Sequence, residues 1–530
     1  MPSRDDDNSP RNGFASRHGR RDFLKASAVA GVAGASLLTS PPARAHDGRG
    51  QEPPRDSGKP GRRYVIRGGA VMSMDPTVGD FEVADVVVDG TKIVEIRPHV
   101  HAPGVDEIDA RGRIVMPGFV DTHHHQFETA LRSFLPNALL RDDGSGSPSA
   151  DPSYVEYVLE RFAPAYRPED VYLSSLFAGL AQLDAGVTTV HDVSQIHHSP
   201  EHSDAAIQAL VDAERRAAFG YFQGDGRPEA RYPRDAYRIR KQWFASDDQL
   251  VSMVMGGEIQ EAEEVYTRAW TIARELDLLI AAHAVSGAVP RTVIDELARG
   301  TGGSTGDLGF GPDVLFIHMT GMSDLTWRRA RDAGVRVSVA FPIEMHMRHG
   351  VPPILTMQKL GMEPSLSSDV ETTMAADPFT LMRSALTMQR MLVNQMVLEQ
   401  GDFTPPNEWP TPAEGTPPLL TVRDVLRYAT INGAAHLRLD HKTGSLTPGK
   451  EADIVLLDAT ALNVAPLNNV PGAVVTLMDR TNVETVIVAG KVRKWRGRLL
   501  GVDLDRLRHD LENSRDYLFR AVGIRPDLFA

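Results

Sequence analysis

The fold is decided by residues 117–125, which read PGFVDTHHH. An apolar run ends there in an acid and three histidines. Side chains two positions apart in a strand point the same way, so His123 and His125 share one face. Two imidazoles on one face at the end of a strand form half of a metal site. Because a histidine triplet can also be a surface feature, the rest of the chain is needed to distinguish a metal site from a surface feature.

Three later apolar segments end in the same manner. Residues 280–283 read IAAH, residues 315–318 read LFIH, and residues 365–369 read SLSSD. A single histidine at a strand end is more often structural than a ligand, but four such endings in one array are difficult to explain in that way. We therefore predict that His283, His318 and Asp369 lie with the first pair of histidines.

The middle of the chain, residues 117–435, alternates short apolar strands with helical stretches such as 205–218 and 260–276. The first strand ends at Asp121, and seven more are predicted at 186–193, 217–223, 250–255, 278–284, 314–319, 335–340 and 364–369. Eight repeated βα units favour an α/β fold with a parallel (β/α)8 TIM-like barrel. In such barrels the chemistry lies at the C-terminal ends of the strands.

The flanking segments have a different texture. Residues 62–116 and 436–500 contain short β-rich runs separated by glycine-containing turns. We expect these two ends to pack together as one small β-sandwich domain. Residues 501–530 are predicted to form a C-terminal helical tail.

The N-terminus resembles a twin-arginine (Tat) export signal. Arg20 and Arg21 precede a mildly apolar run of about a dozen residues, too short to span a bilayer, and residues 43–45 form a small-x-small cleavage pattern. Residues 1–45 are therefore expected to be a signal peptide handled by the Tat translocase, and the Gly/Pro-rich residues 46–61 a linker. The expected location is secreted, periplasmic or in the cell envelope.

Composition excludes several classes of protein. The 530 residues carry a formal net charge of −13, which disfavours nucleic acid as a partner. With 42% hydrophobic and 24% charged residues the chain reads as globular, and no stable membrane insertion is expected. The absence of cysteine leaves only His, Asp or Glu as ligands for a transition metal.

Taken together, these motifs resemble the amidohydrolase superfamily, in particular its aminohydrolases of cytosine-, guanine- and triazine-type heterocycles. The resemblance covers residues 63 to about 495 and includes GVTTV at 186–190 and GSLTPGKEADIV at 444–455. It implies that one divalent metal is held by four ligands, with His318 as an acid–base residue beside them. The implied ligands are His123, His125, His283 and Asp369.

One metal rather than two is expected. Two-metal members bridge their ions with a carboxylated lysine near the end of the fourth strand, whereas the nearest lysine here, Lys241, lies well before it. The ligand set suits Zn²⁺, with Fe²⁺ or Mn²⁺ possible. By this resemblance Asp369 takes a proton from the metal-activated water and passes it to the leaving group, while His318 polarises or protonates the electrophile.

One departure from the family pattern concerns a glutamate. Deaminases of this branch usually carry one three residues after the fifth-strand histidine, where it protonates a ring nitrogen, but the chain has Ser286 there. Either another carboxylate substitutes, for which Glu344 and Glu371 are candidates, or the substrate needs no ring protonation.

Further substrate contacts are expected from the loops after the strands. The candidates are Gln126, Arg132, His197, His198, Glu344, His349 and Glu371. The leading hypothesis is a deaminase-type hydrolase of a carbon–nitrogen bond in a small heterocyclic or cyclic-amide compound. The alternatives are an amide or lactam ring-opening hydrolase, a carbon–halide or carbon–sulfur hydrolase, and a non-catalytic metal-binding homologue. A homo-oligomer is possible.

Overall fold

The computed structural model describes six stretches of the chain, namely residues 52–147, 151–224, 231–285, 287–300, 308–400 and 409–529. The predicted signal peptide and residues 46–51 of the predicted linker lie outside them, and so does Ser286. Residues from Pro53 onward group into one unit, to which every element below belongs. No helix of the described residues is long and apolar enough to cross a bilayer.

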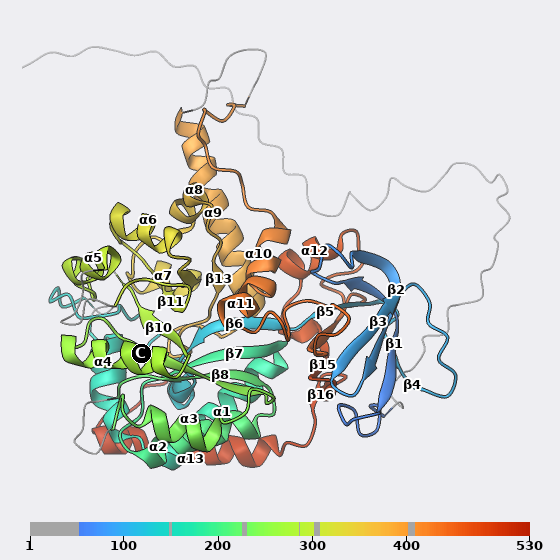
Figure 1. Ribbon diagram of the computed structural model, residues 1–530, viewed down its shortest axis with the longest axis horizontal. Helices are drawn as coiled ribbons and strands as arrows, with labels where there is room; N and C mark the ends of the chain where they lie inside the picture. Colours follow the sequence, from blue (N-terminus) through green and yellow to red (C-terminus); the bar gives the residue numbers. More distant parts are fainter. Residues whose placement is uncertain are drawn as a thin grey trace, which may run out of the picture. The chain divides into compact units, whose positions relative to one another are not determined.

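Eight parallel strands follow one another around a barrel, each hydrogen-bonded to the next (Figure 1). They are β6 (Phe119–His124), β7 (Val187–Ser194), β8 (Arg216–Tyr221), β9 (Val251–Gly256), β10 (Leu279–His283), β11 (Val314–Ile317), β12 (Arg336–Val339) and β13 (Ser365–Leu366). Successive strands are connected by α1 (Pro168–Asp184), α2 (Pro200–Asp212), α3 (Ala236–Trp243), α4 (Glu263–Glu275), α5 (Arg291–Arg299), α6 (Asp324–Asp332) and the pair α7 (Phe341–His346) and α8 (Ile354–Leu360). After β13 come α9 (Pro378–Gln400), α10 (Val422–Tyr428) and α11 (Ile431–His436). The predicted (β/α)8 barrel is confirmed.

The last strand returns to the first and brings their ends together. The backbone N–H of Asp369 donates to the carbonyl of His123, and the N–H of His125 donates to the carbonyl of Asp369, both at 2.9 Å. Below them, the hydroxyl of Thr122 donates to the carbonyl of Leu366 at 3.0 Å. Closure therefore places two of the predicted histidines and the predicted aspartate in one layer at the barrel mouth.

The barrel strands are buried on both faces, which explains their nearly continuous apolar sequences. In β10, Leu279 and Ala281 join a cluster formed by side chains of several barrel strands and α11, whereas Ile280 and Ala282 pack with the surrounding helices. His283 follows Ala281 by two positions, so its side chain points to the same side of the strand as those of Leu279 and Ala281. Its side chain is therefore directed into the barrel mouth.

Strands from both ends of the chain form one nine-stranded sheet, whose blue N-terminal and red C-terminal strands are visible in Figure 1. The strands are β1 (Arg63–Met72), β2 (Asp80–Asp89), β3 (Lys92–Arg97), β4 (Asp106–Asp109), β5 (Arg113–Pro117), β14 (Ile454–Asp458), β15 (Val483–Val488), β16 (Lys491–Trp495) and β17 (Arg498–Leu499). The two ends meet where β5 pairs antiparallel with β14. Apolar side chains of eight of these strands pack into a core of their own. The predicted small domain formed by both ends of the chain is confirmed as β-rich; eight of its strands follow one hydrogen-bonded path, and β4 pairs with β1 beside it.

A buried ion pair joins the barrel to this sheet. The guanidinium of Arg216, in β8, donates to Asp453 at 2.8 Å and to Glu451 at 2.6 Å. Its side chain is 1% exposed, so the pair is shielded from water. Gly118, in the first motif, also donates its N–H to the carbonyl of Asp453 at 3.0 Å. Two of the motifs that carried the resemblance thus meet at one junction.

One predicted helix is wrong at its C-terminal end. The helix expected over residues 205–218 is α2, which ends at Asp212, because residues from Arg216 onward pair with β7 as the strand β8. Its start also differs, since Pro200 occupies the first helical turn, a position that suits its fixed φ.

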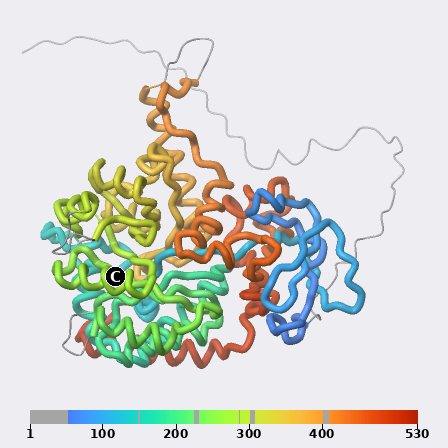
Figure 2. The backbone as a smooth tube through the Cα atoms, in the orientation of Figure 1, coloured from blue at the N-terminus to red at the C-terminus, as the bar shows by residue number. Residues whose placement is uncertain are grey.

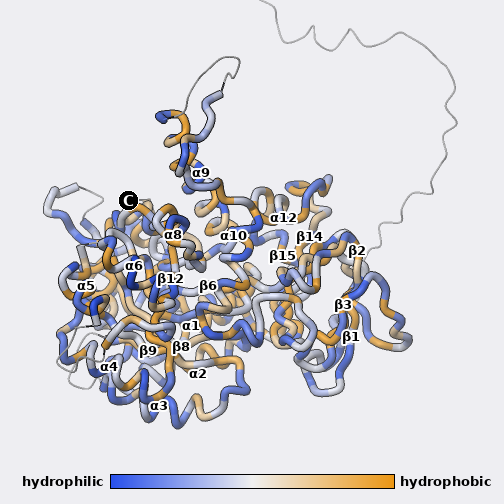
Figure 3. The backbone as a smooth tube through the Cα atoms, turned by 45° about the horizontal axis from the view of Figure 1, so that its top comes forward, coloured by the Kyte–Doolittle hydropathy of each residue, from blue (hydrophilic) through white to orange (hydrophobic). Residues whose placement is uncertain are grey.

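Helix α9 buries one face, on which Phe379, Met382, Leu386 and Val393 lie. Figure 3 shows hydrophobic and hydrophilic segments alternating along α9.

In the predicted helical tail, α13 (Leu504–Val522) packs against the start of α1, and its red helix lies beneath the green barrel helices in Figure 2. There Ser514 donates to Asp170 at 2.6 Å, and the Arg167 guanidinium lies 3.6 Å from the ring centre of Tyr517.

Candidate metal centre and pocket

Three histidines converge at the barrel mouth. His123 and His125 come from the end of β6 and His283 from the end of β10. The Nε2 atom of His123 lies 2.9 Å from that of His125 and 3.2 Å from that of His283. Burial, and then the neighbouring imidazoles, hold the pKa of His123 well below its usual value. The same causes lower the pKa of His125, so the rings of His123 and His125 are neutral and each has a lone pair available.

Asp369 completes the cluster from the segment after β13. Its Oδ1 lies 3.5 Å from Nε2 of both His123 and His125, and its Oδ2 lies 3.5 Å from Nε2 of His318. Asp369 and His318 both have positive φ, at 65° and 69°. Residues other than glycine rarely adopt this conformation. Those that do are concentrated at functional sites, where the surrounding structure enforces it.

The donor atoms fit a divalent metal ion. Ligand atoms about 2.1 Å from a tetrahedral Zn²⁺ lie roughly 3.4 Å from one another. His123 Nε2 lies 2.9–3.5 Å from a donor atom of each of the other three residues, and His125 Nε2 lies 3.5 Å from Asp369 Oδ1, so these separations bracket that value. Within the described part of the chain, every group of three or more potential metal ligands is drawn from six neighbouring residues, namely His123, His125, His283, His318, His349 and Asp369. Neutral imidazole nitrogens with one carboxylate oxygen form a donor set typical of zinc.

Two buried glutamates orient the histidines from behind. Nδ1 of His283 donates to Oε1 of Glu258 at 2.6 Å, and Nδ1 of His318 donates to Oε1 of Glu344 at 3.0 Å. A carboxylate on Nδ1 fixes the ring and leaves Nε2 free to act as a ligand or as a base. Glu258 was missed by the sequence analysis, although it follows β9 closely.

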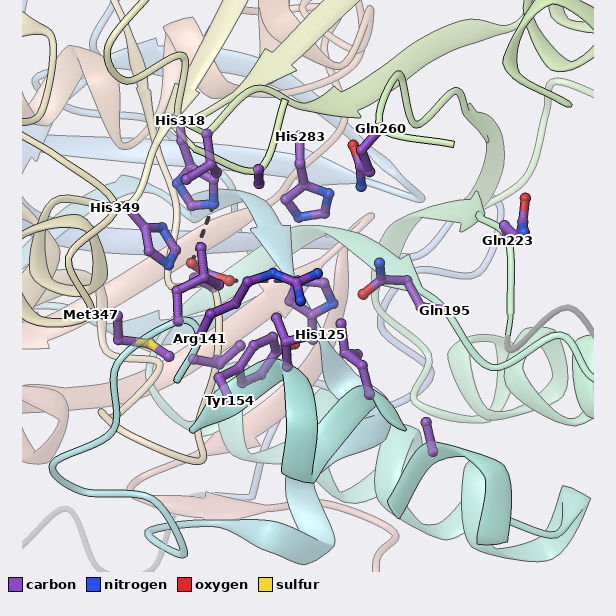
Figure 4. Close-up of a pocket in the computed structure, with 18 of the residues that line it drawn as sticks. His125, Arg141, Tyr154, Gln195, Gln223, Gln260, His283, His318, Met347 and His349 are labelled. Atoms are coloured by element: carbon purple, nitrogen blue, oxygen red, sulfur yellow. Dashed lines mark ion pairs between the residues drawn. The ribbon is translucent and has the colours of Figure 1, made fainter. Parts of the chain in front are cut away.

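A pocket of about 430 Å³ opens above the cluster (Figure 4). Part of its wall is apolar, formed by Leu140, Val155, Leu159, Ala163, Val285, Ala288, Met347 and Val370. Its polar lining comprises Arg141, Tyr154, Gln195, Gln223, Gln260, Glu261, His125, His283, His318, His349 and Asp369. Figure 4 shows the four labelled histidines around the pocket, with a dashed line that starts at His318, whose Nε2 lies 3.5 Å from Asp369 Oδ2.

His349 is the predicted substrate contact that lines this pocket. It is 4% exposed, and neither ring nitrogen has a hydrogen-bond partner among the described residues. Its ring centre lies 4.7 Å from that of His318. Burial lowers the pKa of His349 to about 3, so the ring is neutral and can accept or donate one hydrogen bond.

The other predicted contacts lie outside the pocket lining. Gln126 binds the guanidinium of Arg215, and Arg132 donates to both oxygens of Glu371 at 2.8 and 2.7 Å. Glu371 also accepts from the hydroxyl of Thr129 at 3.1 Å. Arg132 and Thr129 thus fix the loop after β6 to the loop after β13 through Glu371.

The two histidines after β7 have structural partners. Nδ1 of His197 lies 2.9 Å from Oγ of Ser203, and Nε2 of His198 donates to the carbonyl of Ala163 at 2.9 Å. Asp192, at the end of the same strand, is buried, which raises its pKa to about 7, and it accepts from the N–H of Gln126 at 3.4 Å. The loop after β7 is thus fixed against its neighbours.

Comparison with known proteins identifies the family. A model of the amidohydrolase family matches residues 114–493. The chain belongs to this family. The expectation of a hydrolase that acts on carbon–nitrogen bonds other than peptide bonds is confirmed by this membership.

Similar proteins span nearly the whole chain. A 5'-deoxyadenosine deaminase of Methanosarcina acetivorans is 25% identical over 466 residues, which cover 86% of this chain and 98% of the relative. A 5-methylthioadenosine/S-adenosylhomocysteine deaminase of Desulforudis audaxviator is 25% identical over 477 residues, or 87% and 100% of the two chains.

Two zinc-bound crystal structures share the fold. An adenosine deaminase from Xanthomonas campestris superposes with a TM-score of 0.70 at 21% identity and covers 87% of this chain and 99% of its own. An atrazine chlorohydrolase from Arthrobacter aurescens superposes with a TM-score of 0.67 at 21% identity and covers 85% and 100%.

Proposed function

We propose that this amidohydrolase is a zinc-dependent deaminase that hydrolyses an amino substituent from the ring of a small nitrogen heterocycle. The observation that carries the proposal is the convergence of His123, His125, His283 and Asp369 directly beneath a pocket with an apolar wall. Those four residues would hold one ion. Fe²⁺ or Mn²⁺ would suit the same donor set.

A divalent ion bound there would supply Lewis acidity, lowering the pKa of a water at the site from about 15.7 to about 7. Asp369 then acts as the base. Its Oδ2 is buried, has no hydrogen-bond partner among the described residues, and lies on the side of His318. It takes the proton of the attacking water and delivers it to the departing amine.

His318 orients the attack. Because its Nδ1 donates to Glu344, its Nε2 presents a lone pair at 3.5 Å from Asp369 Oδ2. The ring is placed to accept a hydrogen bond from the water that Asp369 deprotonates. We infer that it positions this water, in place of the expected role of polarising or protonating the electrophile.

The pocket suits a flat heterocycle. Its apolar wall, which includes Leu140, Val155 and Met347, offers a surface on which a ring can pack. Gln195 and Gln223 each present an amide oxygen that has no hydrogen-bond partner among the described residues. Such oxygens accept hydrogen bonds from the N–H groups of a heterocycle. The relatives named above act on adenine-containing compounds, which supports an aminopurine as the first substrate class to test.

A second candidate is the hydrolytic displacement of halide or thioether sulfur from the same kind of ring. A leaving group that departs as an anion does not need the proton that Asp369 delivers to an amine, so the same site would serve both reactions. The similar structure whose name is atrazine chlorohydrolase has the same fold.

We further propose that the enzyme acts outside the cytoplasm after export by the Tat route. The support is the Arg20–Arg21 pair, the short apolar run after it and the small-x-small pattern at residues 43–45. A deaminase at that location meets compounds from the environment before it meets internal nucleotide pools.

The test compares wild type with Asp369→Asn, using Asp247→Asn as a matched control because that carboxylate is 94% exposed. Each zinc-loaded protein is incubated with aminopurine nucleosides, aminotriazines, their chlorinated counterparts and cyclic amides. Ammonia release by wild type and the control, with loss of at least about 10²-fold in Asp369→Asn, is the expected result. Chloride as the only product would show a carbon–halide hydrolase instead of a deaminase, and a ring-opened acid as the only product would show a ring-opening hydrolase.

A further inference from the structure

A deaminase of a heterocycle needs a proton donor for the ring nitrogen next to the attacked carbon. When water adds to that carbon, the C=N electron pair moves onto the nitrogen, and the developing negative charge is stabilised by a proton. The glutamate that supplies this proton in the resembled deaminases is absent, since its position holds Ser286.

The structure removes the two substitutes that the sequence suggested. Glu344 is 1% exposed, and its Oε1 is occupied by the N–H of Ala340 and by Nδ1 of His318. Glu371 is held by Arg132 and Thr129. Neither of these two glutamates lines the pocket.

Two carboxyl groups line the pocket among the described residues, those of Asp369 and Glu261. Asp369 belongs to the metal cluster and already carries the proton of the water. Glu261 lies just before α4, on the loop that follows β9. Because β9 neighbours β10 in the barrel, this loop adjoins the loop after His283, whose Val285 and Ala288 line the same pocket.

We propose that Glu261 is the catalytic acid that protonates the substrate ring, taking over from the neighbouring loop the task of the missing glutamate. The proposal rests on the deaminase function above. In the first step the water oxygen bonds to the ring carbon, its proton goes to Asp369, and the carboxyl proton of Glu261 goes to the ring nitrogen. In the second step the carbon–amine bond breaks and ammonia leaves with the proton from Asp369. The remaining hydroxyl becomes a carbonyl, and its proton restores the Glu261 carboxyl.

The surroundings of Glu261 favour a protonated carboxyl. Partial burial raises its pKa, and the nearby Glu258 raises it further, whereas a hydrogen bond from the Gln223 side chain lowers it. Burial, and then Glu258, Tyr221 and Glu261, raise the pKa of Tyr232, whose hydroxyl donates to the carbonyl of Gly256 at 2.5 Å. No cationic side chain of the described residues acts on the Glu261 carboxyl to stabilise its charged form.

Glu258 has a separate task. Its Oε1 accepts from Nδ1 of His283 and its Oε2 from the backbone N–H of the same residue at 3.2 Å. It is 2% exposed and does not line the pocket. The loop after β9 therefore supplies one carboxyl that orients a candidate metal ligand and one that lines the pocket.

The experiment compares Glu261→Gln and Glu261→Asp with Glu264→Gln, which removes an exposed carboxylate from the first turn of α4. All are zinc-loaded and assayed for ammonia release from the substrate that wild type turns over best. We expect Glu261→Gln to lose about 10²–10⁴-fold in kcat/KM with unchanged zinc content, Glu261→Asp to retain part of the rate, and the control to match wild type. The basic limb of the kcat/KM profile against pH should disappear in Glu261→Gln.

Three outcomes are distinguishable. An active wild type with Glu261→Gln within about threefold of it, or with an unchanged basic limb, overturns the role of Glu261 and leaves the deaminase intact. A wild type that releases no ammonia from any heterocycle overturns the proposed function and this inference together. Zinc loss in Glu261→Gln would assign the residue to the metal site and contradict the proposal.

Discussion

Glu258 accepts a hydrogen bond of 2.6 Å from Nδ1 of His283, whose opposite nitrogen lies 3.2 Å from His123. The ring is thereby fixed from behind, with its free lone pair facing the other candidate ligands. Although burial lowers the pKa of His283, this glutamate outweighs burial and raises it. A carboxylate in this position also makes an imidazole a stronger ligand.

Removing that carboxylate should weaken zinc binding. We expect Glu258→Gln to lower the affinity for zinc by about 10–100-fold, because His283 loses its orienting partner. Competition with a chromophoric chelator measures the change, and Glu263→Gln, an exposed acid at the start of α4, serves as control. Equal affinities in wild type and Glu258→Gln would show that His283 needs no such support.

His349 should affect substrate binding while leaving the metal in place. Replacing it by alanine removes one hydrogen-bonding side chain from the pocket, worth about 0.5–1.5 kcal/mol, or roughly 2–13-fold in KM. Zinc content should stay at the wild-type level. His346→Ala is the control, since this exposed neighbour binds the carbonyl of Pro136 outside the pocket. A loss of zinc in His349→Ala would make the residue a ligand.

Arg216 should be essential for stability. Replacing it by methionine leaves Asp453, 0% exposed, and Glu451 without their cation, at a cost of about 3–5 kcal/mol in the free energy of unfolding. Chemical denaturation measures this. The exposed pair of Arg63 with Asp89 is the matched control, and Arg63→Met should cost less than about 1 kcal/mol. Equal losses in the two variants would contradict a special role for the buried pair.

Low pH should destabilise the fold through the ion pair of Arg216 with Glu451. Burial raises the pKa of Glu451, but Arg216 outweighs it, so the net pKa lies below the ordinary value of 4.5. A carboxyl with a lowered folded-state pKa stabilises the fold above its unfolded pKa and loses that contribution as pH falls through the folded value. Below pH 4.5 the free energy of unfolding should therefore fall more steeply for wild type than for Arg216→Met. Parallel curves would exclude the contribution of Glu451.

The sequence predicted the elements that follow a simple periodicity. His123, His125, His283, His318 and Asp369 each end an apolar strand, and parallel strands place such ends in one layer, so their convergence was predictable. Glu258 also follows a strand, but it precedes a run of other acids in QEAEE and reads as a solvated charge. Its pairing with His283 depends on barrel closure, which sequence spacing does not encode.

Loop contacts were less predictable for the same reason. Glu344 and Glu371 have the right chemistry for substrate contact, yet His318 and Arg132 occupy them. A loop side chain can turn toward the pocket or toward the scaffold, and the choice depends on partners distant in sequence. The helix predicted over residues 205–218 extended wrongly into β8. Two alanines in Arg216–Phe219 favour a helix, but pairing with β7 holds this segment as a strand.

The most direct test of the central claim is the zinc content of the purified, folded protein, measured by mass spectrometry for wild type and His283→Ala. The account predicts about one equivalent of divalent metal in wild type and a large loss in the variant, with both chains folded by circular dichroism. A folded wild type that turns over substrate without metal, or a variant that holds as much metal as wild type, would contradict it.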